Sequence, residues 1–311
     1  MSSHDLFLGS EYAQQPRHTA RFHVIPVPYE YTVSYGAGTA NGPQAILTAS
    51  DQLEVFDGTS SPGDNGIHTE PPLDCAGGPS AVFPRISTAV ATAVREGPDG
   101  GGIPIILGGE HSITAPAVRG VQEVLHEPIG VVQIDAHADL RDQYEGTRES
   151  HATVARRIHQ DLGLSLVQIG VRALSPEEVS YRADGASRAG QRSTYPTITT
   201  YDAVSIVPSG VSAISLPESF PQRIYLTIDV DGLDPSVIAA TGTPVPGGLG
   251  WYQLLSILES IAATREIVAC DVVELAPIPG HHGWDYTAAE LVYRTMGIIA
   301  RSPACRKPHG T

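Results

Sequence analysis

Short apolar runs alternate with helix-like segments along most of the chain, and this alternation limits the fold more than any other feature. The runs are rich in Val, Ile and Leu and are almost continuously apolar, which is typical of strands buried on both faces. Six of them are expected to be strands: residues 22–27, 103–108, 129–135, 164–170, 223–231 and 266–275. Because strands that alternate with helices build parallel sheets, the sequence predicts an α/β fold around a mainly parallel sheet.

The segments between these runs have the spacing of apolar residues that one face of a helix requires. The expected helices are residues 43–56, 82–97, 113–125, 151–162, 251–265 and 285–301. The stretch 55–80 is rich in Gly, Pro, Asp and Ser, so we expect a loop insertion there. The alternation resumes after this stretch, so we expect one domain over residues 1–311.

Polar clusters stand directly after four of the expected strands. The run IPIILG leads into GEHS, IGVVQI into DAHAD, RIYLTI into DVDGLDPS, and ACDVV into ELAP. In open α/β sheets, ligands bind outside the carboxyl ends of the strands. Buried charges are costly unless they are paired or bound to a metal. Four strands are therefore expected to deliver acids and histidines to one edge of the sheet.

Six of these side chains have the chemistry and the spacing of metal ligands. They are His111, Asp135, His137, Asp139, Asp229 and Asp231. Residues two apart on an extended segment point to the same side, so each cluster can converge. Mixed nitrogen and oxygen ligands suit Mn²⁺, Zn²⁺, Fe²⁺ or Ni²⁺. Four carboxylates balance two divalent ions better than one, which favours a two-metal site.

Each cluster alone has a simpler explanation. DAHADLRD resembles a calcium loop, but His137 and the lack of a suitably placed Glu break the EF-hand pattern. TIDVDGLDP can equally be a strand end followed by a turn, and the HS after two glycines can be structural. Their joint occurrence at four strand ends favours the metal site.

These motifs, taken in order, resemble those of the ureohydrolase family of arginases and agmatinases. The resemblance rests on GGEHS, DAHADLRD, SHAT and DVDGLDPS, and extends to VPYEYTVSYGAGTANGPQAIL and DVVELAPIPG. It is strongest to the bacterial and archaeal agmatinases. It implies a three-layer α/β/α fold with a mainly parallel sheet of eight strands, two Mn²⁺ per subunit, and a homotrimer or homohexamer.

The resemblance also implies two sets of metal ligands that share Asp135 and Asp229. One metal would be held by His111, Asp135, Asp139 and Asp229. The other would be held by His137, Asp135, Asp229 and Asp231. Every ligand position of the family pattern is filled, which argues against an inactive relative.

Three residues resemble the family's catalytic groups. Asp139 would accept a hydrogen bond from the attacking hydroxide and carry its proton to the leaving amine. His151 resembles a proton-shuttling histidine, although it can also be only the first residue of a helix. Glu274 resembles the carboxylate that pairs with the substrate guanidinium. The negative charge left over in such a site would select a small cationic guanidino substrate.

Arginases bind the α-amino and α-carboxylate groups with a loop rich in Asn, Ser and Thr, whereas the loop LRDQYEGTRES at 140–150 departs from that pattern and resembles the agmatinase branch. We therefore expect agmatine as substrate, hydrolysed to putrescine and urea, with N1-aminopropylagmatine, 4-guanidinobutyrate, guanidine and, last, arginine as alternatives. Asp142, Glu145 and Glu149 can attract a distal ammonium, or they can simply face solvent. Arg141 and Arg148 can instead attract a carboxylate.

The segment PGHHGWD contains four more polar or aromatic residues that can line the entrance. They are His281, His282, Trp284 and Asp285. A surface turn before the last helix explains them as well, so they are not placed in the site.

Two other functions compete with this interpretation. Zinc deacetylases share the fold with a single-metal version of the site, but here the complete ligand set favours two metals. A metal-binding protein without turnover would not need His151 or Glu274.

Composition excludes several partners. With 19 basic and 34 acidic residues the formal net charge is −15, which disfavours nucleic acid and anionic membranes. No stretch approaches the roughly 20 apolar residues of a membrane span, and MSSHDLFLGS has no signal-peptide pattern, so we expect a cytoplasmic protein. Cys75, Cys270 and Cys305 are too scattered for a disulfide framework, and we expect Cys270 to be a small buried side chain.

Overall fold

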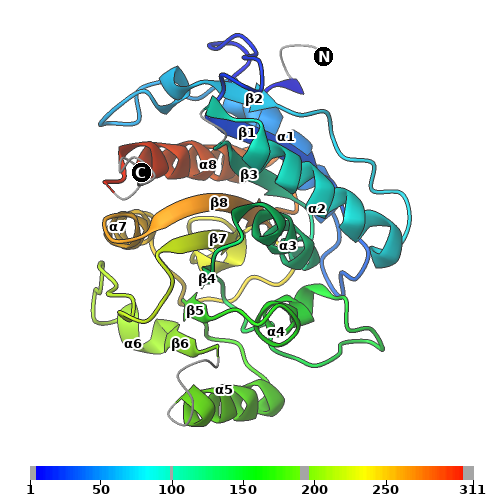
Figure 1. Ribbon diagram of the computed structural model, residues 1–311, viewed down its shortest axis with the longest axis vertical. Coiled ribbons are helices and arrows are strands. Elements are labelled where there is room, and N and C mark those ends of the chain that lie inside the picture. The colour runs from blue at the N-terminus through cyan, green and yellow to red at the C-terminus, as the bar shows by residue number, and fades with distance from the viewer. Residues whose placement is uncertain (1–4, 99–100, 190–195, 304–311) are drawn as a thin grey trace.

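One eight-stranded sheet organises the molecule (Figure 1). The computed structural model describes residues 5–98, 101–189 and 196–303. The strands are β1 (Phe22–Val27), β2 (Ile67–Thr69), β3 (Ile103–Gly108), β4 (Ile129–Ile134), β5 (Leu166–Ile169), β6 (Ile198–Tyr201), β7 (Arg223–Asp229) and β8 (Glu266–Val273). Their order across the sheet is β2-β1-β3-β8-β7-β4-β5-β6, and every neighbouring pair is parallel. The predicted α/β class and the implied eight-stranded sheet are confirmed.

All six strands expected from the apolar runs are present, and the sequence pattern missed the two short edge strands. β2 lies inside the stretch 55–80, where we expected only a loop. Its Ile67 and Thr69 are buried, and it pairs with one edge of β1. β6 pairs with β5 at the other edge. Edge strands of three or four residues are too short to show a period, which explains both omissions.

Helices cover both faces of the sheet, which gives the three layers that the resemblance implied (Figure 1). The α-helices are α1 (Gly42–Ser50), α2 (Pro79–Arg95), α3 (Thr114–Leu125), α4 (Val154–Arg156), α5 (Pro176–Ala189), α6 (Ala203–Ile206), α7 (Trp251–Ala262) and α8 (Gly283–Arg301). Apolar residues of α1, α7 and α8 pack in one core, and those of α2, α3 and α4 pack in a second core on the opposite face.

Two expected helices are shorter or less regular than the pattern suggested. The helix expected over 43–56 ends at Ser50, whose hydroxyl donates to the carbonyl of Leu47 and accepts the N–H of Leu8. Side-chain bonds of this kind compete with helix continuation. The helix expected over 151–162 is a 3₁₀ turn, the short α4 and a π turn in succession.

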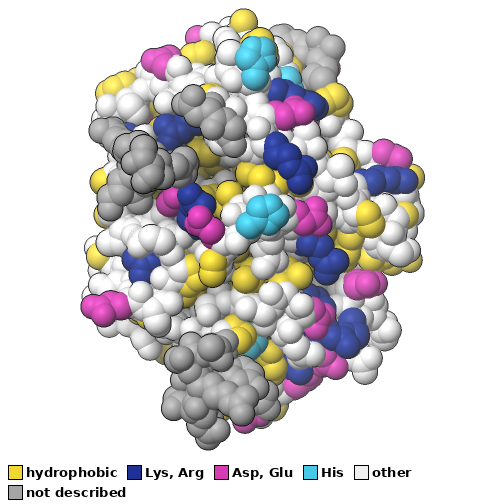
Figure 2. Space-filling view, in the orientation of Figure 1, with side chains coloured by type: hydrophobic (Ala, Val, Ile, Leu, Met, Phe, Trp, Pro, Cys, Tyr) yellow, Lys and Arg dark blue, Asp and Glu magenta, His cyan; other side chains and the backbone are white. Residues whose placement is uncertain are grey.

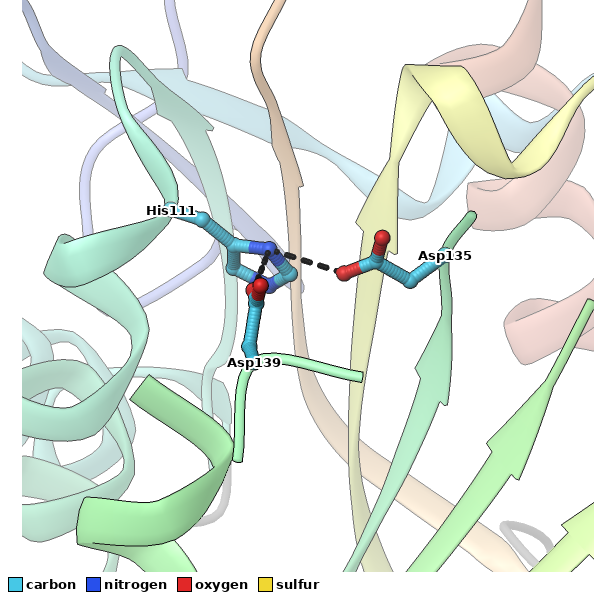
Figure 3. A group of neighbouring side chains, drawn as sticks. All are labelled: His111, Asp135 and Asp139. Carbon is cyan, nitrogen blue, oxygen red and sulfur yellow. Dashed lines mark ion pairs between the residues drawn. The ribbon is translucent and has the colours of Figure 1, made fainter. Parts of the chain in front are cut away.

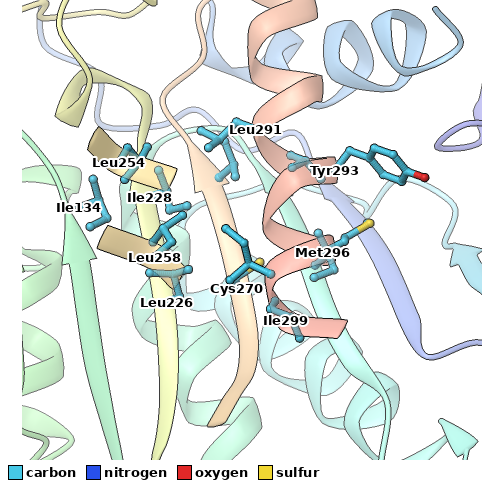
Figure 4. Close-up of a cluster of buried hydrophobic side chains, with 14 of the residues drawn as sticks. Ile134, Leu226, Ile228, Leu254, Leu258, Cys270, Leu291, Tyr293, Met296 and Ile299 are labelled. Atoms are coloured by element: carbon cyan, nitrogen blue, oxygen red, sulfur yellow. The ribbon is translucent and has the colours of Figure 1, made fainter. Parts of the chain in front are cut away.

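The core between the sheet and helices α7 and α8 is built mainly from aliphatic side chains, with Tyr293, Met296 and Cys270 among them (Figure 4). Cys270 lies in this core with 1% of its surface exposed, as predicted. Cys75 is also a free thiol, and Cys305 lies outside the described residues.

The surface shown in Figure 2 mixes acidic and basic side chains and has no broad patch of one sign. Among the described residues, no helix combines the length and the apolar character that crossing a membrane would require.

Candidate metal centre

The four central strands β3, β8, β7 and β4 end side by side, and the polar clusters that follow them meet in one cleft. The segments after β3 and β4, the last residue of β7 and the turn that follows it contribute the six predicted ligands, and Glu274 directly follows β8. The cleft is lined by Val33, Ser34, Tyr35, Gly36, His111, His137, Asp139, Arg141, Tyr144, His151, Ala152, Asp229, Asp231, Gly242, Thr243 and Glu274. The predicted convergence at one edge of the sheet is confirmed.

The first group of candidate ligands surrounds the imidazole of His111. Its Nδ1 lies 3.2 Å from Asp135 Oδ2, 3.2 Å from Asp139 Oδ2 and 3.3 Å from Asp229 Oδ2. Figure 3 shows Asp135 and Asp139, both in the segment that follows β4, approaching the ring of His111 from different directions. The side chains of His111, Asp135 and Asp139 are all buried. Such an arrangement of one nitrogen and several carboxylate oxygens could hold a metal ion.

The other nitrogen of His111 is held by a buried hydroxyl. His111 Nε2 lies 2.9 Å from Thr227 Oγ1, Thr227 Oγ1 lies 3.4 Å from Thr114 Oγ1, and the hydroxyl of Thr114 donates to the buried carboxylate of Asp271 at 2.8 Å. Thr114 uses its only proton for Asp271 and can therefore only accept from Thr227, so Thr227 donates to Thr114 and accepts from Nε2–H. In a neutral imidazole this places the free lone pair on Nδ1, the atom that faces the three carboxylates.

The surroundings of His111 Nδ1 are suited to a cation. Nδ1 of His111 is buried and makes no well-directed hydrogen bond to any described residue, although three carboxylate oxygens surround it. A lone pair facing three negative charges is unfavourable, so a proton or a metal ion must lie between them.

A second group lies beside the first and shares Asp135 with it. His137 Nδ1 lies 3.0 Å from Asp231 Oδ2 and 3.7 Å from Asp135 Oδ1. Backbone groups orient these carboxylates: the N–H of His137 donates to Asp135 Oδ1 at 2.6 Å, and that of Ala136 donates to Asp231 Oδ1 at 3.1 Å. A single-metal site would need only one of these two overlapping groups of ligands, so the pair favours two metals.

Burial and the crowding of charges raise the pKa values of three of the candidate ligands. Burial and then Asp135 raise the pKa of Asp139 to about 7, and burial with Asp231 and Asp135 raises the pKa of Asp229 well above its usual range. Burial alone would lower the pKa of His137, but Asp135 and Asp231 outweigh it and raise the pKa to about 12. Without metal, protons therefore occupy the positions that cations would take.

Glu274 is held at the cleft by the backbone of His111, whose N–H donates to Glu274 Oε1 at 2.6 Å. Burial raises the pKa of Glu274 to about 8. Its φ of 66° and the φ of 52° at Asp139 lie in the left-handed region, which is costly for these residues and is concentrated at functional sites. The predicted guanidinium partner therefore lines the same cleft as the metal groups.

Close backbone contacts explain glycines near the site. A Cβ at Gly109 would lie 2.1 Å from the carbonyl oxygen of Tyr29. Only glycine therefore allows the loop after β3 to lie this close to the segment after β1. At the rim, a Cβ at Gly36 would lie 2.7 Å from the Cα of Gly242. The loops that contain Gly36 and Gly242 therefore touch at the rim of the cleft.

His151 also lines the cleft, as its predicted role requires. It begins a 3₁₀ turn in which Ser150 and Thr153 form a reciprocal capping box, so it is a helix-start residue as well. Tyr144 meets its ring edge-on, with 5.6 Å between the ring centroids.

Of the charged residues in the loop 140–150, only Arg141 lines the cleft. Its guanidinium stacks over the ring of Tyr144 at 5.3 Å. Asp142 instead accepts from Arg157 Nη2 at 2.9 Å, and Arg148 points to Asp161 at 3.3 Å. Neither Asp142 nor Arg148 lines the cleft, and each forms an ion pair outside it. Glu145 is exposed and Glu149 lines a different groove.

The segment PGHHGWD does not line the cleft, in agreement with the surface-turn interpretation. His281 stacks on Trp284 with 5.7 Å between ring centroids, and His282 Nδ1 lies 3.5 Å from Asp285 Oδ2. Asp285 lies in the first turn of α8, where a carboxylate is favoured by the helix dipole.

Several residues that support the site escaped the sequence analysis. Thr227 lies in the middle of a strand, and Arg172 donates to the carbonyls of Asp231, Leu233 and Val245. Asp234 accepts the backbone N–H groups of Gly247 and Gly248 and so holds the rim loop that contains Gly242. Asp234 could have been singled out from the sequence, because it belongs to the motif DVDGLDPS. The others depend on contacts between distant segments.

Comparison with known proteins agrees with the motifs. The model of the arginase family matches residues 20–297. The chain is 38% identical to N(1)-aminopropylagmatine ureohydrolase of Synechocystis, with 90% of this chain and 89% of that protein covered. It is 33% identical to agmatinase of Pyrococcus horikoshii, with 91% and 92% covered. The crystal structure of agmatine ureohydrolase of Thermoplasma volcanium superposes with a TM-score of 0.75 at 27% identity, covering 94% of this chain and 97% of that one. The chain belongs to the arginase family.

Proposed function

We propose that the protein hydrolyses the guanidinium group of N1-aminopropylagmatine and releases urea and a triamine. The observation that carries this substrate is the 38% identity to N(1)-aminopropylagmatine ureohydrolase over nine-tenths of the chain. Agmatine, the substrate expected from the sequence, is the second candidate, supported by the 33% identity to an agmatinase. The relatives thus favour the longer polyamine, which the sequence motifs alone did not separate from agmatine.

The proposed cofactor is a pair of Mn²⁺ ions. His111, Asp135, Asp139 and Asp229 would hold one, and His137, Asp135, Asp229 and Asp231 the other. The sharing of Asp135 between the two candidate groups and the approach of Asp229 to His111 support this division. When bound, two divalent ions lower the pKa of water and so provide hydroxide near neutral pH.

The chain's own residues would orient the substrate and move its protons. Glu274, anchored through Oε1, presents its remaining carboxylate oxygen to the guanidinium. Hydrolysis breaks the bond between the guanidinium carbon and the alkylated nitrogen, so that nitrogen must gain a proton as it leaves. Asp139 accepts a proton from the attacking water, and His151 exchanges protons between the cleft and the leaving amine.

The substrate tail would be recognised at a rim where Glu274 is the one described lining carboxylate outside the metal groups. Among the described lining residues outside the metal groups, Glu274 is the acidic one and Arg141 is the basic one. Tyr35, which is 87% exposed, and Tyr144 offer aromatic surfaces to an ammonium-bearing tail. Arg141 favours a different candidate, a guanidino compound with a carboxylate at its other end, such as 4-guanidinobutyrate.

The test is urea release by Mn²⁺-loaded protein with N1-aminopropylagmatine, agmatine, 4-guanidinobutyrate, arginine and guanidine. The proposal expects the highest kcat/KM for N1-aminopropylagmatine. A preference for agmatine or 4-guanidinobutyrate would replace the substrate and keep the chemistry. The absence of urea from every compound, with two metals bound, would overturn the proposed function.

The variant Arg141→Gln separates the two kinds of tail. Removing this positive charge should raise kcat/KM for the cationic tails and lower it for 4-guanidinobutyrate. Arg148→Gln, in the same loop but paired with Asp161, is the matched control.

The oligomeric state remains the prediction made from the resemblance. A homotrimer or homohexamer would have three or six times the monomer mass, which light scattering coupled to gel filtration measures directly.

A further inference from the structure

The hydroxyl of Thr32 lies between a buried carboxylate and the imidazole of His151. Thr32 Oγ1 is 2.9 Å from Glu110 Oε1 and 3.1 Å from His151 Nδ1. It also accepts the backbone N–H of His151 at 3.1 Å. Thr32 is 119 positions from His151 in the chain, so this contact exists only in the folded protein.

Glu110 acts in this network only as an acceptor. Its side chain is fully buried and receives the backbone N–H groups of Tyr31 and Thr32 at Oε2, each at 2.6 Å. Its Oε1 receives the hydroxyls of Thr32 and Ser112. A carboxylate with four donors around it has no proton to give, and each donor that turned away would leave it less satisfied.

The direction of the hydrogen bonds then follows from counting protons. A threonine hydroxyl has one proton and two lone pairs. Thr32 donates its proton to Glu110, so its lone pairs face the backbone N–H and Nδ1 of His151. Two lone pairs cannot bond to each other, so Nδ1 must bear the proton that it shares with Thr32. In the neutral imidazole the lone pair is then on Nε2.

We propose that Thr32, oriented by Glu110, is a positioning residue that holds His151 with its proton on Nδ1 and leaves Nε2 as the proton-accepting atom. The proposal rests on the proposed function for what His151 does with that atom. Once Nε2 takes a proton, the Thr32–Glu110 pair stabilises the resulting imidazolium through Nδ1–H. The logic is that of an orienting carboxylate in a catalytic triad, with a hydroxyl inserted between the carboxylate and the imidazole.

The surroundings limit the other ways in which the ring could be held. The capping box of Ser150 and Thr153 holds the backbone at His151, and Tyr144 meets the ring edge-on. Ser150 Oγ is also near Nδ1 but at 3.4 Å, farther than Thr32. Thr32 is therefore the principal polar contact of Nδ1 among the described residues.

The test compares Thr32→Val, which keeps the shape and removes the hydroxyl, with Thr32→Ser, which restores it. Full-length protein labelled with ¹⁵N-histidine and loaded with diamagnetic Zn²⁺ reports the tautomer of His151 in two-bond ¹H–¹⁵N spectra. The spectrum of His151→Asn identifies the signal. We expect Nδ1–H in the wild type and in Thr32→Ser, and a mixture of tautomers in Thr32→Val. With Mn²⁺, Thr32→Val should lose about tenfold or more in kcat, with little change in KM.

Glu110→Gln provides a second arm that does not depend on Thr32→Val folding. An amide NH₂ in place of Oε1 donates to Thr32, whose own proton then turns to His151 Nδ1. The expected result is a shift of the imidazole proton to Nε2. Thr39→Val removes a comparable hydrogen bond to Glu30 in the same loop and should leave the tautomer of His151 unchanged.

An Nε2–H tautomer in the wild type would overturn the proposal, and so would an Nδ1–H tautomer that survives both Thr32→Val and Glu110→Gln. A change in the Thr39→Val control equal to that in Thr32→Val would assign the effect to the loop and also overturn it. The spectra are independent of turnover. If the tautomer depends on Thr32 while no guanidino compound yields urea, the positioning role stands and the proposed function fails.

Discussion

Glu274 Oε1 accepts the backbone N–H of His111 at 2.6 Å across a separation of 163 residues. This bond joins the end of β8 to the loop after β3, so one carboxylate both fixes a candidate metal ligand and faces the substrate cleft. The two roles can be separated, because one needs only a hydrogen-bond acceptor and the other needs negative charge.

Replacing Glu274 tests that separation. Glu274→Gln keeps an acceptor for His111 N–H but removes the charge that pairs with a guanidinium, so kcat/KM should fall by roughly a hundredfold or more. Glu274→Ala should also lose turnover. Metal content, measured by elemental analysis, should stay at the wild-type value in Glu274→Gln. Near-normal activity in both variants would remove the assigned role.

The two carboxylates Asp135 and Asp231 should differ in their effect on metal content. Asp135 belongs to both candidate groups, whereas Asp231 belongs to the group of His137 alone. We expect Asp231→Asn to retain about one equivalent of metal and Asp135→Asn to retain less. Equal losses in the two variants would show that the groups are not arranged around a shared carboxylate.

Removal of metal should lower the thermal stability of the protein. Without cations the crowded carboxyl groups must take up protons to relieve their repulsion, and a ligand at about 100 times its Kd stabilises the folded state by about 2.7 kcal/mol. For a domain of this size, Tm should fall by roughly 5 °C or more after chelation and recover with Mn²⁺. Mg²⁺ at the same concentration is the control for general ionic effects. An unchanged Tm would argue against metal binding in this cleft.

Thr227 should control how tightly His111 binds metal. Thr227→Val removes the acceptor of Nε2–H, so Nδ1 is no longer held as the free lone pair, and metal affinity should fall roughly 10–100-fold. Thr227→Ser keeps the hydroxyl and should restore the affinity. A competition titration with a metal indicator measures both, and equal affinities for the Val and Ser variants would contradict the prediction.

Asp234 should contribute to stability only above strongly acidic pH. Hydrogen bonds from the side chain and backbone of Ser236, and then from Gly247 and Gly248, lower its pKa from 3.8 to about 2. Because the folded-state pKa is the lower one, this contribution is fully present above the unfolded value and disappears as pH falls through the folded value.

The difference in free energy of unfolding between the wild type and Asp234→Ala should therefore be constant near neutral pH and shrink toward pH 2. Denaturant titrations at several pH values measure it, and Glu218→Ala, a substitution at an acidic residue outside this loop, serves as the control. A difference that grew at acid pH would contradict the assignment.

Local sequence patterns determined most of the fold and the composition of the site. Continuous apolar runs mark buried strands because a strand covered on both faces must be apolar throughout, and β1, β3, β4, β5, β7 and β8 follow this rule. Acids and histidines directly after such runs can lie only at the carboxyl edge of a parallel sheet. For this reason the local pattern is sufficient to single out Asp135, His137 and Asp229 as candidate ligands.

Tertiary structure alone decided which of these groups meet and which supporting residues hold them. The strand order places β8 beside both β3 and β7, and this brings Glu274 to His111. It also places Thr227 behind His111, pairs Asp142 with Arg157, and turns Arg141 toward the cleft. The physical reason is that periodicity reports only whether a side chain faces the core. The partner of a buried polar group is set by the packing of segments that lie far apart in the chain.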